Sequence, residues 1–440
     1  MRPATSNLPV ECFSREDGSR FIFHMLKKTS PTEDDKRGAS ELSELVGGHV
    51  LALTQATSLM FKKHWSVKKY LDMHSRHPQR IRDTRSIEWL HAGYSEDIKT
   101  VFLMSFKSIS DRASVILQVL SLLAPDLIPE HIFVLENQID PPALLNFCFD
   151  EFEYVLGPFV LLVQPYDTHL THYRVSDIID ELIGLALVNR DSETNKLSIH
   201  RLVQSEVRIQ TGNDLQVAFN NVSFLLSESF PKQVHGRTFE PRYEECAGLI
   251  QHLYALRDHL RDGPYAGGKL QPTHNFCRVM CNAAYYLVEK GATKELQQTI
   301  EVAMDAFQRT ELNRQDPLAY AHLCNSAALE REMSGDFLAA QELLNTAMDI
   351  RTRELPPGHE AIWGVNVNLG NLCISRGQYN DALRFHNICR ETANTEFVGN
   401  VTATLGNLAR AYTALGRFDE AEETLNELKR IRGPDNLTFR

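Results

Sequence analysis

The hexapeptide Gly-Asp-Phe-Leu-Ala-Ala at residues 335–340 recurs as Gly-Gln-Tyr-Asn-Asp-Ala at 377–382 and as Gly-Arg-Phe-Asp-Glu-Ala at 416–421. All three copies have the form Gly-x-aromatic-x-x-Ala, at intervals of 42 and 39 residues. Seven positions before the glycines stand three small residues, Ala328, Gly370 and Ala409. A weaker copy lies 44 residues earlier, at Ala284, Gly291 and Ala303. Copies in phase predict a structural repeat.

Each copy holds the residues that a tight pair of antiparallel helices needs. Glycine permits the left-handed backbone that the bend between two helices often requires. The small residue on the first helix and the alanine on the second let the helices approach closely, and the aromatic ring fills the space towards the neighbour. This is the pattern of tetratricopeptide repeats, whose stacked pairs bury a continuous core and expose a concave groove. We therefore predict an α-solenoid over residues 270–440.

The position within each repeat also predicts which residues face the groove. Six residues of the first helices fall at such positions: Asn325, Leu329, Val367, Asn371, Gly406 and Arg410. The set contains no lysine, so it does not resemble the repeats that clamp acidic chaperone tails. We take Asn325, Asn371 and Arg410 as candidate residues for binding a protein or peptide partner. A solvated polar helix face is the alternative interpretation of the same three residues.

Composition limits the class of protein. The chain of 440 residues is 43 % apolar and 23 % charged, as in an ordinary globular protein of several domains. Its net charge of −11 is opposite to the field of a dedicated nucleic-acid binder, so nucleic acid is not an expected partner. No apolar run approaches the length of a membrane span and no secretory signal opens the chain. We therefore expect no membrane association and a cytoplasmic location.

The chain before the repeats is also largely helical by pattern. Residues 1–38 are polar, with a helical patch at 18–28 and a cluster of helix-breaking residues at 30–35. Apolar residues follow helical spacing over 39–82 and again over 85–123, where Asp111 is the expected helix N-cap.

A helix, a hairpin and a second helix are expected between residues 176 and 209. The helix begins at Ser176, two short apolar segments at 187–190 and 196–200 flank a polar turn, and a helix follows over 202–209. This order describes a winged-helix unit. The hairpin holds two basic residues, Arg190 and Lys196, which two neighbouring acidic residues offset. We therefore favour a packing module over a DNA reader, because DNA binding needs clustered basic side chains.

No pattern assembles a catalytic or metal site. Residues 263–270 carry the glycines and lysine of a phosphate loop, but Leu270 stands where magnesium needs Ser or Thr, and Pro264 removes an amide. Cys277 and Cys281 are not followed by a second ligand pair with zinc-finger spacing. We therefore predict a protein that is not an enzyme and holds no metal.

Two short segments resemble motifs of the NB-ARC nucleotide-binding switches. Residues 45–56, Leu-Val-Gly-Gly-His-Val-Leu-Ala-Leu-Thr-Gln-Ala, resemble the Leu-Gly-Gly-Leu-Pro-Leu-Ala-Leu segment of the helical subdomain of that family. Residues 199–204, Ile-His-Arg-Leu-Val-Gln, resemble the Met-His-Asp segment at the end of its winged helix. With the repeats that follow, the chain from about residue 10 onward resembles the NB-ARC and tetratricopeptide-repeat proteins of STAND (NLR-like) type that are abundant in filamentous fungi.

The resemblance implies a mainly α fold: a helical subdomain, a winged-helix domain and a tetratricopeptide α-solenoid. It implies the following boundaries: 1–38, the remnant of the end of a nucleotide-binding domain; 39–108, a helical (ARC-like) subdomain; 109–212, a winged-helix-like domain; 213–269, a helical connector; 270–440, the repeats.

The departures from the family pattern concern the nucleotide site. His200 matches the histidine that contacts the diphosphate, and Gly48 lies in the matching glycine pair, so the resemblance implies that both are vestigial cofactor-binding residues. The base-packing proline of the family corresponds to Val50, and its aspartate to Arg201. Only 44 residues precede Leu45, too few for the phosphate-loop domain. We therefore expect no nucleotide hydrolysis and no cofactor, with ADP as the one candidate.

These observations lead us to expect a non-catalytic interaction or regulatory protein that binds a protein partner in its repeat groove. We expect a monomer, because the switches of the family form rings through the domain that is missing here. Two alternatives stay open: the carboxyl-terminal part of an ADP/ATP-dependent STAND switch, and a winged-helix transcriptional regulator of a gene cluster. Two origins of the chain also stay open: a reduced standalone gene product, and a gene model that begins too late.

Overall fold

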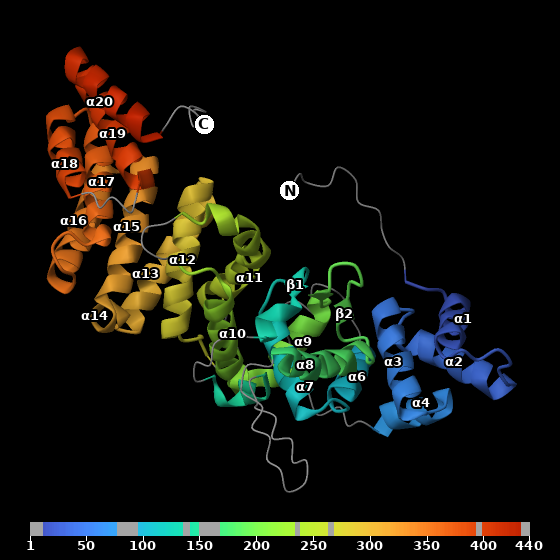
Figure 1. The fold of residues 1–440 in the computed structure, drawn as a ribbon. Helices are drawn as coiled ribbons and strands as arrows, with labels where there is room; N and C mark the ends of the chain where they lie inside the picture. Colours follow the sequence, from blue (N-terminus) through green and yellow to red (C-terminus); the bar gives the residue numbers. More distant parts are fainter. Residues whose placement is uncertain are drawn as a thin grey trace, which may run out of the picture. The chain divides into compact units, whose positions relative to one another are not determined.

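The computed structural model describes residues 12–76, 96–134, 141–148, 168–233, 238–262, 268–392 and 398–432. These residues form helices and one small sheet, so the predicted mainly α fold is confirmed (Figure 1). The chain divides into two compact units. The first comprises residues 1–229 and 262–270, and the second residues 230–261 and 271–440.

The first unit begins with a cluster of helices. They are α1 (Arg15–Met25), α2 (Glu33–Leu45), α3 (Val50–Lys63), α4 (Val67–Arg76) and α6 (Glu96–Phe106). Helix α1 contacts α2 and α3, and α3 contacts α6. Large apolar side chains from all five helices are buried between them: Ile22, Leu42, Leu53, Leu59, Met60, Tyr70 and Phe102.

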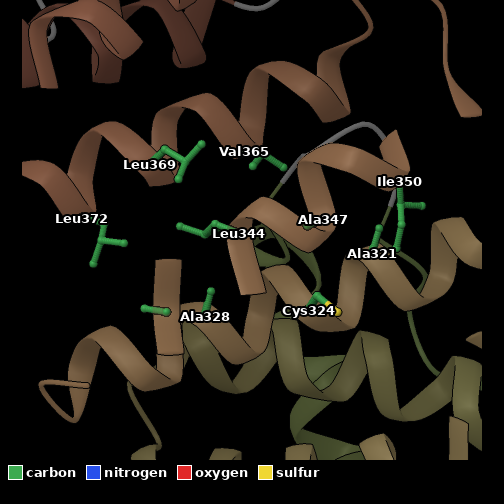
Figure 2. Packing of buried hydrophobic residues seen from close by; sticks show 10 residues of the cluster. Ala321, Cys324, Ala328, Leu344, Ala347, Ile350, Val365, Leu369 and Leu372 are labelled. Carbon is green, nitrogen blue, oxygen red and sulfur yellow. The ribbon is translucent and has the colours of Figure 1, made fainter. Parts of the chain in front are cut away.

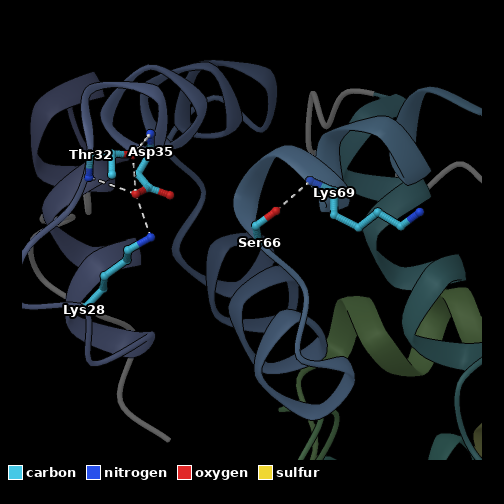
Figure 3. A network of polar contacts seen from close by, with 5 residues as sticks. All are labelled: Lys28, Thr32, Asp35, Ser66 and Lys69. Atoms are coloured by element: carbon cyan, nitrogen blue, oxygen red, sulfur yellow. Dashed lines mark hydrogen bonds and ion pairs between the residues drawn. The ribbon is translucent and has the colours of Figure 1, made fainter.

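The start of α2 corrects the prediction of a breaker cluster at residues 30–35. Thr32 is the N-cap of α2 and forms a capping box with Asp35, so the acidic residues lie in the first turn of the helix. Lys28 Nζ lies 2.6 Å from Asp35 Oδ2, and hydrogen bonds from Lys28 and Thr32 lower the pKa of Asp35 to about 2 (Figure 3). In the same view, Ser66 Oγ accepts a hydrogen bond from the Lys69 backbone in the first turn of α4. A polar run that resembled a loop therefore starts a helix.

The first unit continues with helices around a three-stranded sheet. In chain order they are α7 (Asp111–Ser121), β1 (Ile128–Pro129), η1 (Glu130–Phe133), η2 (Ala143–Cys148), α8 (Thr168–Ile183), β2 (Asn189–Arg190), β3 (Lys196–Ser198), α9 (Arg201–Thr211), η3 (Gly212–Asp214) and α10 (Leu215–Ser229). The sheet order is β1-β3-β2, and both pairings are antiparallel.

The predicted hairpin is present. Asn189 pairs with Ser198 and Arg190 with Leu197, and the carboxylate of Asp191 accepts the backbone N–H of Glu193 in the turn. Three details differ from the sequence-based expectations. Helix α8 begins at Thr168, before the predicted Ser176; the N-cap of α7 is Ser110 rather than Asp111; and strand β1 was not predicted.

The second unit is built from helix pairs. After η4 (Glu240–Arg242), its elements are α11 (Tyr243–Asp262), α12 (His274–Lys290), α13 (Thr293–Arg309), α14 (Leu312–Gln315), α15 (Pro317–Met333), α16 (Phe337–Glu354), α17 (Glu360–Ser375), α18 (Tyr379–Glu391), α19 (Val398–Ala414) and α20 (Phe418–Arg432). Each of the pairs α12/α13, α15/α16, α17/α18 and α19/α20 is joined at a glycine: Gly291, Gly335, Gly377 and Gly416.

These four glycines have φ values of +62°, +83°, +73° and +72°, the left-handed region that the bend requires. Between the pairs, small and branched residues form continuous apolar layers (Figure 2). Ala328 on α15 and Ala340 on α16 are buried at the close approach of the two helices, and Leu344 lies against Leu369 and Leu372 of the next pair. The spacing that predicted the repeat therefore marks the residues that build its core.

The segment 213–269 contributes to both units. Helix α10 belongs to the first unit, and α11 to residue 261 belongs to the second. Most of the phosphate-loop-like segment 263–270 lies outside the described residues.

Candidate functional site

Two asparagine pairs connect the first helices of successive repeats. Asn368 Nδ2 on α17 donates to Asn325 Oδ1 on α15 at 2.8 Å. Asn407 Nδ2 on α19 donates to Asn371 Oδ1 on α17 at 2.7 Å. Because Asn368 and Asn371 lie one turn apart on α17, both pairs follow the same face of the stack. The two candidate asparagines, Asn325 and Asn371, thus each belong to one of these pairs.

The hydrogen bond within each pair uses the amide nitrogen of one asparagine and the carbonyl oxygen of the other. The second amide nitrogen and the second carbonyl oxygen of the pair remain. Among the described residues, the amide nitrogen of Asn325 and the carbonyl oxygen of Asn368 make no further hydrogen bond, and the same holds for Asn371 and Asn407. Asn325 is 7 % exposed, and the other three side chains are half-buried. A residue of an extended peptide offers one N–H and one C=O, which is the complement of what a pair presents.

The other groove positions add one charge and some apolar surface. Arg410, one turn beyond Asn407 on α19, is exposed. Leu329 is half-buried, and Met333, one turn further along α15, is 48 % exposed. Val367 and Gly406 are half-buried. The face therefore combines carboxamides with apolar side chains and a single arginine.

Sequence reasoning missed Asn368 and Asn407, which donate in the two pairs. A signal for them exists in the repeat. An asparagine stands nine residues before three of the four bend glycines, as Asn282, Asn368 and Asn407. In the first of these repeats, Asn282 Oδ1 accepts the backbone N–H of Gln233 at 2.9 Å. The position is therefore a recurrent polar contact on the first helices.

The two residues implied by the NB-ARC resemblance lie in the first unit, at the starts of α3 and α9. His200 is the N-cap of α9, and its Nδ1 accepts the backbone N–H of Leu202 at 3.2 Å. His49, directly after Gly48, is the N-cap of α3 in the same way. Partial burial and the nearby charge of His200 lower the pKa of His49, so the structure brings the two motifs together. Val50 is 39 % exposed beside them.

Gly48 has a structural role that the resemblance did not indicate. Its φ is +68°, and a Cβ there would lie 2.0 Å from the carbonyl oxygen of Phe13. The backbone N–H of Phe13 donates to Gly48 O at 3.0 Å. Because only glycine leaves room for this segment, the turn between α2 and α3 requires it without any ligand.

The basic side chains of the hairpin are not equivalent. Arg190 donates to both carboxylate oxygens of Glu130 at 3.1 Å and to Asp180 Oδ1 at 2.7 Å, so its charge is neutralised inside the unit. Glu130 is 8 % exposed, so the contact with Arg190 is largely shielded from water. A guanidinium held in this way is not available to a phosphate.

Three cysteines of the second unit lie in an unreactive environment. Cys277, Cys281 and Cys324 are buried, and burial raises the pKa of Cys277 and of Cys324 to about 11. Over the described ranges, no group of three or more His, Cys, Asp or Glu side chains could hold a metal ion. In the same described ranges, no helix combines the length and the apolar character needed to cross a membrane.

Comparison with protein families identifies two segments. Residues 361–432 match the tetratricopeptide-repeat model, so the repeats predicted at the carboxyl-terminal end are confirmed. Residues 104–214, which hold α7 to α9, match a domain of unknown function (DUF7779). No NB-ARC model matches. No curated protein matches the chain.

Among solved structures, BtubC (BKLC) from P. vanneervenii is 18 % identical, with a TM-score of 0.36, over 52 % of this chain and 84 % of that one. A Podosopora anserina protein described as a kinesin light chain, with nearly identical TPR-like repeats, is 19 % identical, with a TM-score of 0.35. The match covers 46 % of this chain and 95 % of that one. The third structure is a Signal Transduction ATPase with Numerous Domains (STAND) protein with a tetratricopeptide repeat sensor, from Pyrococcus horikoshii. It is 12 % identical, with a TM-score of 0.34, and the match covers 98 % of this chain and 62 % of that one.

Proposed function

We propose that this chain is a non-enzymatic interaction protein whose repeat face binds an extended peptide segment of a protein partner. The observation that supports the proposal best is the pair of asparagine contacts, Asn325 with Asn368 and Asn371 with Asn407. Each contact holds two carboxamides in a fixed orientation with a donor and an acceptor remaining. Such groups bind a peptide main chain whatever its side chains are.

The chemistry of the face also suggests what the peptide carries. Leu329 and Met333 offer apolar surface beside the first pair, which suits an apolar side chain of the peptide. Arg410 is the one positive charge among the six groove positions and suits an acidic side chain near the second pair. A strongly acidic tail would need more positive charge than this face has. We therefore propose a peptide of mixed apolar and acidic character.

A peptide-selection experiment tests the proposal. The full chain is panned against a displayed library of random peptides, and the selected peptides are measured by calorimetry. The variant Asn368→Ala/Asn371→Ala removes one member of each pair, and we expect it to weaken binding about tenfold or more, the value of one or two hydrogen bonds.

Asn345→Ala is the matched control, because Asn345 is an exposed asparagine on the second helix α16. We expect this control to bind the selected peptides as the parent does. Equal binding by the parent and the double variant, with both folded by circular dichroism, would refute the proposed role of the face.

We further propose that residues 109–212 form a winged helix that serves as a packing module. The order of its helices, the β1-β3-β2 sheet and the engagement of Arg190 within the unit support this role over DNA contact. Helix α9 contributes to the packing, because Gln204 donates to the carbonyl oxygens of Leu120 and Leu123 at the end of α7. We expect the protein to act in the cytoplasm, as its sequence suggests.

A nucleotide-dependent switch is the second candidate function. The juxtaposition of His49 and His200 at the starts of two helices favours it, because helix N-termini attract phosphate groups. Calorimetry of ADP and ATP with the full chain, and with His200→Ala, decides the matter. Heat that disappears in the variant would support the switch. We expect no binding, because the loop that would surround the phosphates has no counterpart in the sequence.

A further inference from the structure

Helix α20, the last helix that the structure describes, exposes a face that the earlier second helices bury. Seven residues after the aromatic residue of each repeat stand Leu344 on α16, His386 on α18 and Leu425 on α20. Their exposed fractions are 1 %, 0 % and 49 %. The aromatic residues differ in the same way, since Phe337 and Tyr379 pack against apolar clusters whereas Phe418 is 67 % exposed.

The cause is the position of α20 in the stack. Helix α16 is covered by α17 and α18 by α19, whereas α20 packs against α19 and no other described helix covers its far side. Phe418 and Leu425 lie seven residues apart and therefore on one stripe of the helix. Exposed side chains of this size on one stripe are typical of an interaction surface.

The charges on this stripe indicate what covers it. Glu422 and Lys429 lie on the same stripe, before and after Leu425, and both are exposed. Neither makes an ion pair with another described residue. If two copies of α20 lie antiparallel, the two Leu425 side chains contact each other near the two-fold axis. Glu422 of each copy then lies opposite Lys429 of the partner subunit, which gives two ion pairs. The stripe is thus complementary to itself, which is what a two-fold interface requires.

We propose that the chain forms a two-fold symmetric dimer through antiparallel α20 helices. This inference does not depend on the proposed peptide site. It differs from the sequence-based expectation of a monomer, which rested on the family resemblance and not on any surface of this chain. A helix of 15 residues is about 22 Å long, so one helix pair buries less than a standard interface of about 1,600 Å². We therefore expect a dissociation constant in the micromolar range.

The first experiment measures the mass of the full chain by sedimentation equilibrium between about 1 and 100 µM. We expect a monomer–dimer equilibrium, and we expect Leu425→Glu to weaken association at least about tenfold because it places two carboxylates at the two-fold axis. Leu338→Glu is the matched control, since Leu338 is 70 % exposed on α16 and lies outside the proposed interface. It should associate as the parent does.

A charge exchange tests the antiparallel arrangement itself. Glu422→Lys alone and Lys429→Glu alone should each be monomeric, because each places like charges opposite one another in the symmetric dimer. Mixed in equal amounts, the two variants should form a heterodimer, because both contacts are then complementary. A single-chain mass for the parent over the whole range would overturn the proposal. So would a Leu425→Glu variant that still forms dimers, or a mixture of the charge variants that stays monomeric.

Discussion

The repeats, residues 270–440, and the hairpin region, residues 109–212, are stabilised by different kinds of contact. In the repeats, the same contact recurs: a glycine bend, two small residues at the closest approach and a branched residue towards the next pair. In the hairpin region, single polar contacts join distant residues, such as Arg190 with Glu130 and Ser110 with Glu181. Among the described residues, the polar groups of the first helices keep unused donors and acceptors, whereas those of the hairpin region are engaged within the fold.

The pair α17/α18 differs from its neighbours at two buried positions of the repeat, and a substitution there should have the largest effect. Gly370 stands where the neighbouring pairs have alanine, and His386 stands where α16 has Leu344. A Cβ on Gly370 would lie 2.6 Å from the buried ring of His386. We expect Gly370→Ala to lower the free energy of unfolding of the repeats by about 3 kcal/mol, measured by urea denaturation.

The double variant Gly370→Ala/His386→Leu supplies the control, because it installs the alanine–leucine pair found at Ala328 and Leu344. We expect it to recover stability to within about 1 kcal/mol of the parent. If the double variant is no more stable than Gly370→Ala, the repeats are not structurally equivalent in the way described here.

The hairpin region should be sensitive to the loss of a single polar contact. Arg190→Ala leaves the carboxylate of Glu130, 8 % exposed, without its partner. We expect the free energy of unfolding to fall by about 2 to 3 kcal/mol, less than for a fully buried pair because the Arg190 side chain is 23 % exposed. Lys196→Ala, at the other basic residue of the hairpin, should cost less than about 0.5 kcal/mol. Equal losses of unfolding free energy in the two variants would mean that the contact of Arg190 with Glu130 does not stabilise the hairpin region.

The repeats should lose stability in mild acid. Burial lowers the pKa of His386 to about 4, below its value of about 6.5 in an unfolded chain. Between these values the unfolded state binds more protons, so the contribution is complete above about pH 6.5 and is lost as the pH falls towards 4. We expect a loss of up to about 2 kcal/mol at pH 5 from this residue. Burial, together with Arg351, also lowers the pKa of His322 to about 4, in the same direction.

His386→Leu isolates the first contribution. Denaturation at pH 7 and pH 5 should show a smaller pH dependence in this variant than in the parent, with the remainder due to His322. An unchanged pH dependence would show that His386 does not titrate as its burial requires.

The smallest expected effect concerns the start of α7. Ser110 Oγ accepts the backbone N–H of Ala113 and donates to Glu181 Oε2 at 2.7 Å. Ser110→Ala should therefore cost about 1 kcal/mol, and Asp111→Ala about 0.5 kcal/mol or less, in the thermal unfolding of the first unit. The reverse order would restore Asp111 as the cap.

The parts of the fold that were predictable from the sequence are those set by local spacing. The bend glycines and small residues recur at a fixed period, so the helix pairs and the mainly α class follow from them. The hairpin was predictable from a turn between two short apolar segments. Strand β1 was not, because it has only two residues, one of which is Pro129, and pairs at an edge of the sheet with β3.

The candidate site was predictable only in part. Asn325 and Asn371 follow from their repeat positions, but their partners lie 43 and 36 residues away in sequence. A repeat pattern gives the face of a helix and not the register between neighbouring helices, so it does not predict which side chains meet. The contact of Gly48 with Phe13 was not predictable either, because it joins two segments that no local pattern pairs.

Backbone N-methylation of a bound peptide tests most directly whether the asparagine pairs bind a peptide main chain. Each amide of a selected peptide is methylated in turn, and the dissociation constants are measured with the parent and with Asn368→Ala/Asn371→Ala. We expect methylation at one or two positions to weaken binding to the parent about tenfold and to change binding to the variant less than about twofold. Equal losses with both proteins, or no sensitive position in the parent, would contradict the claim.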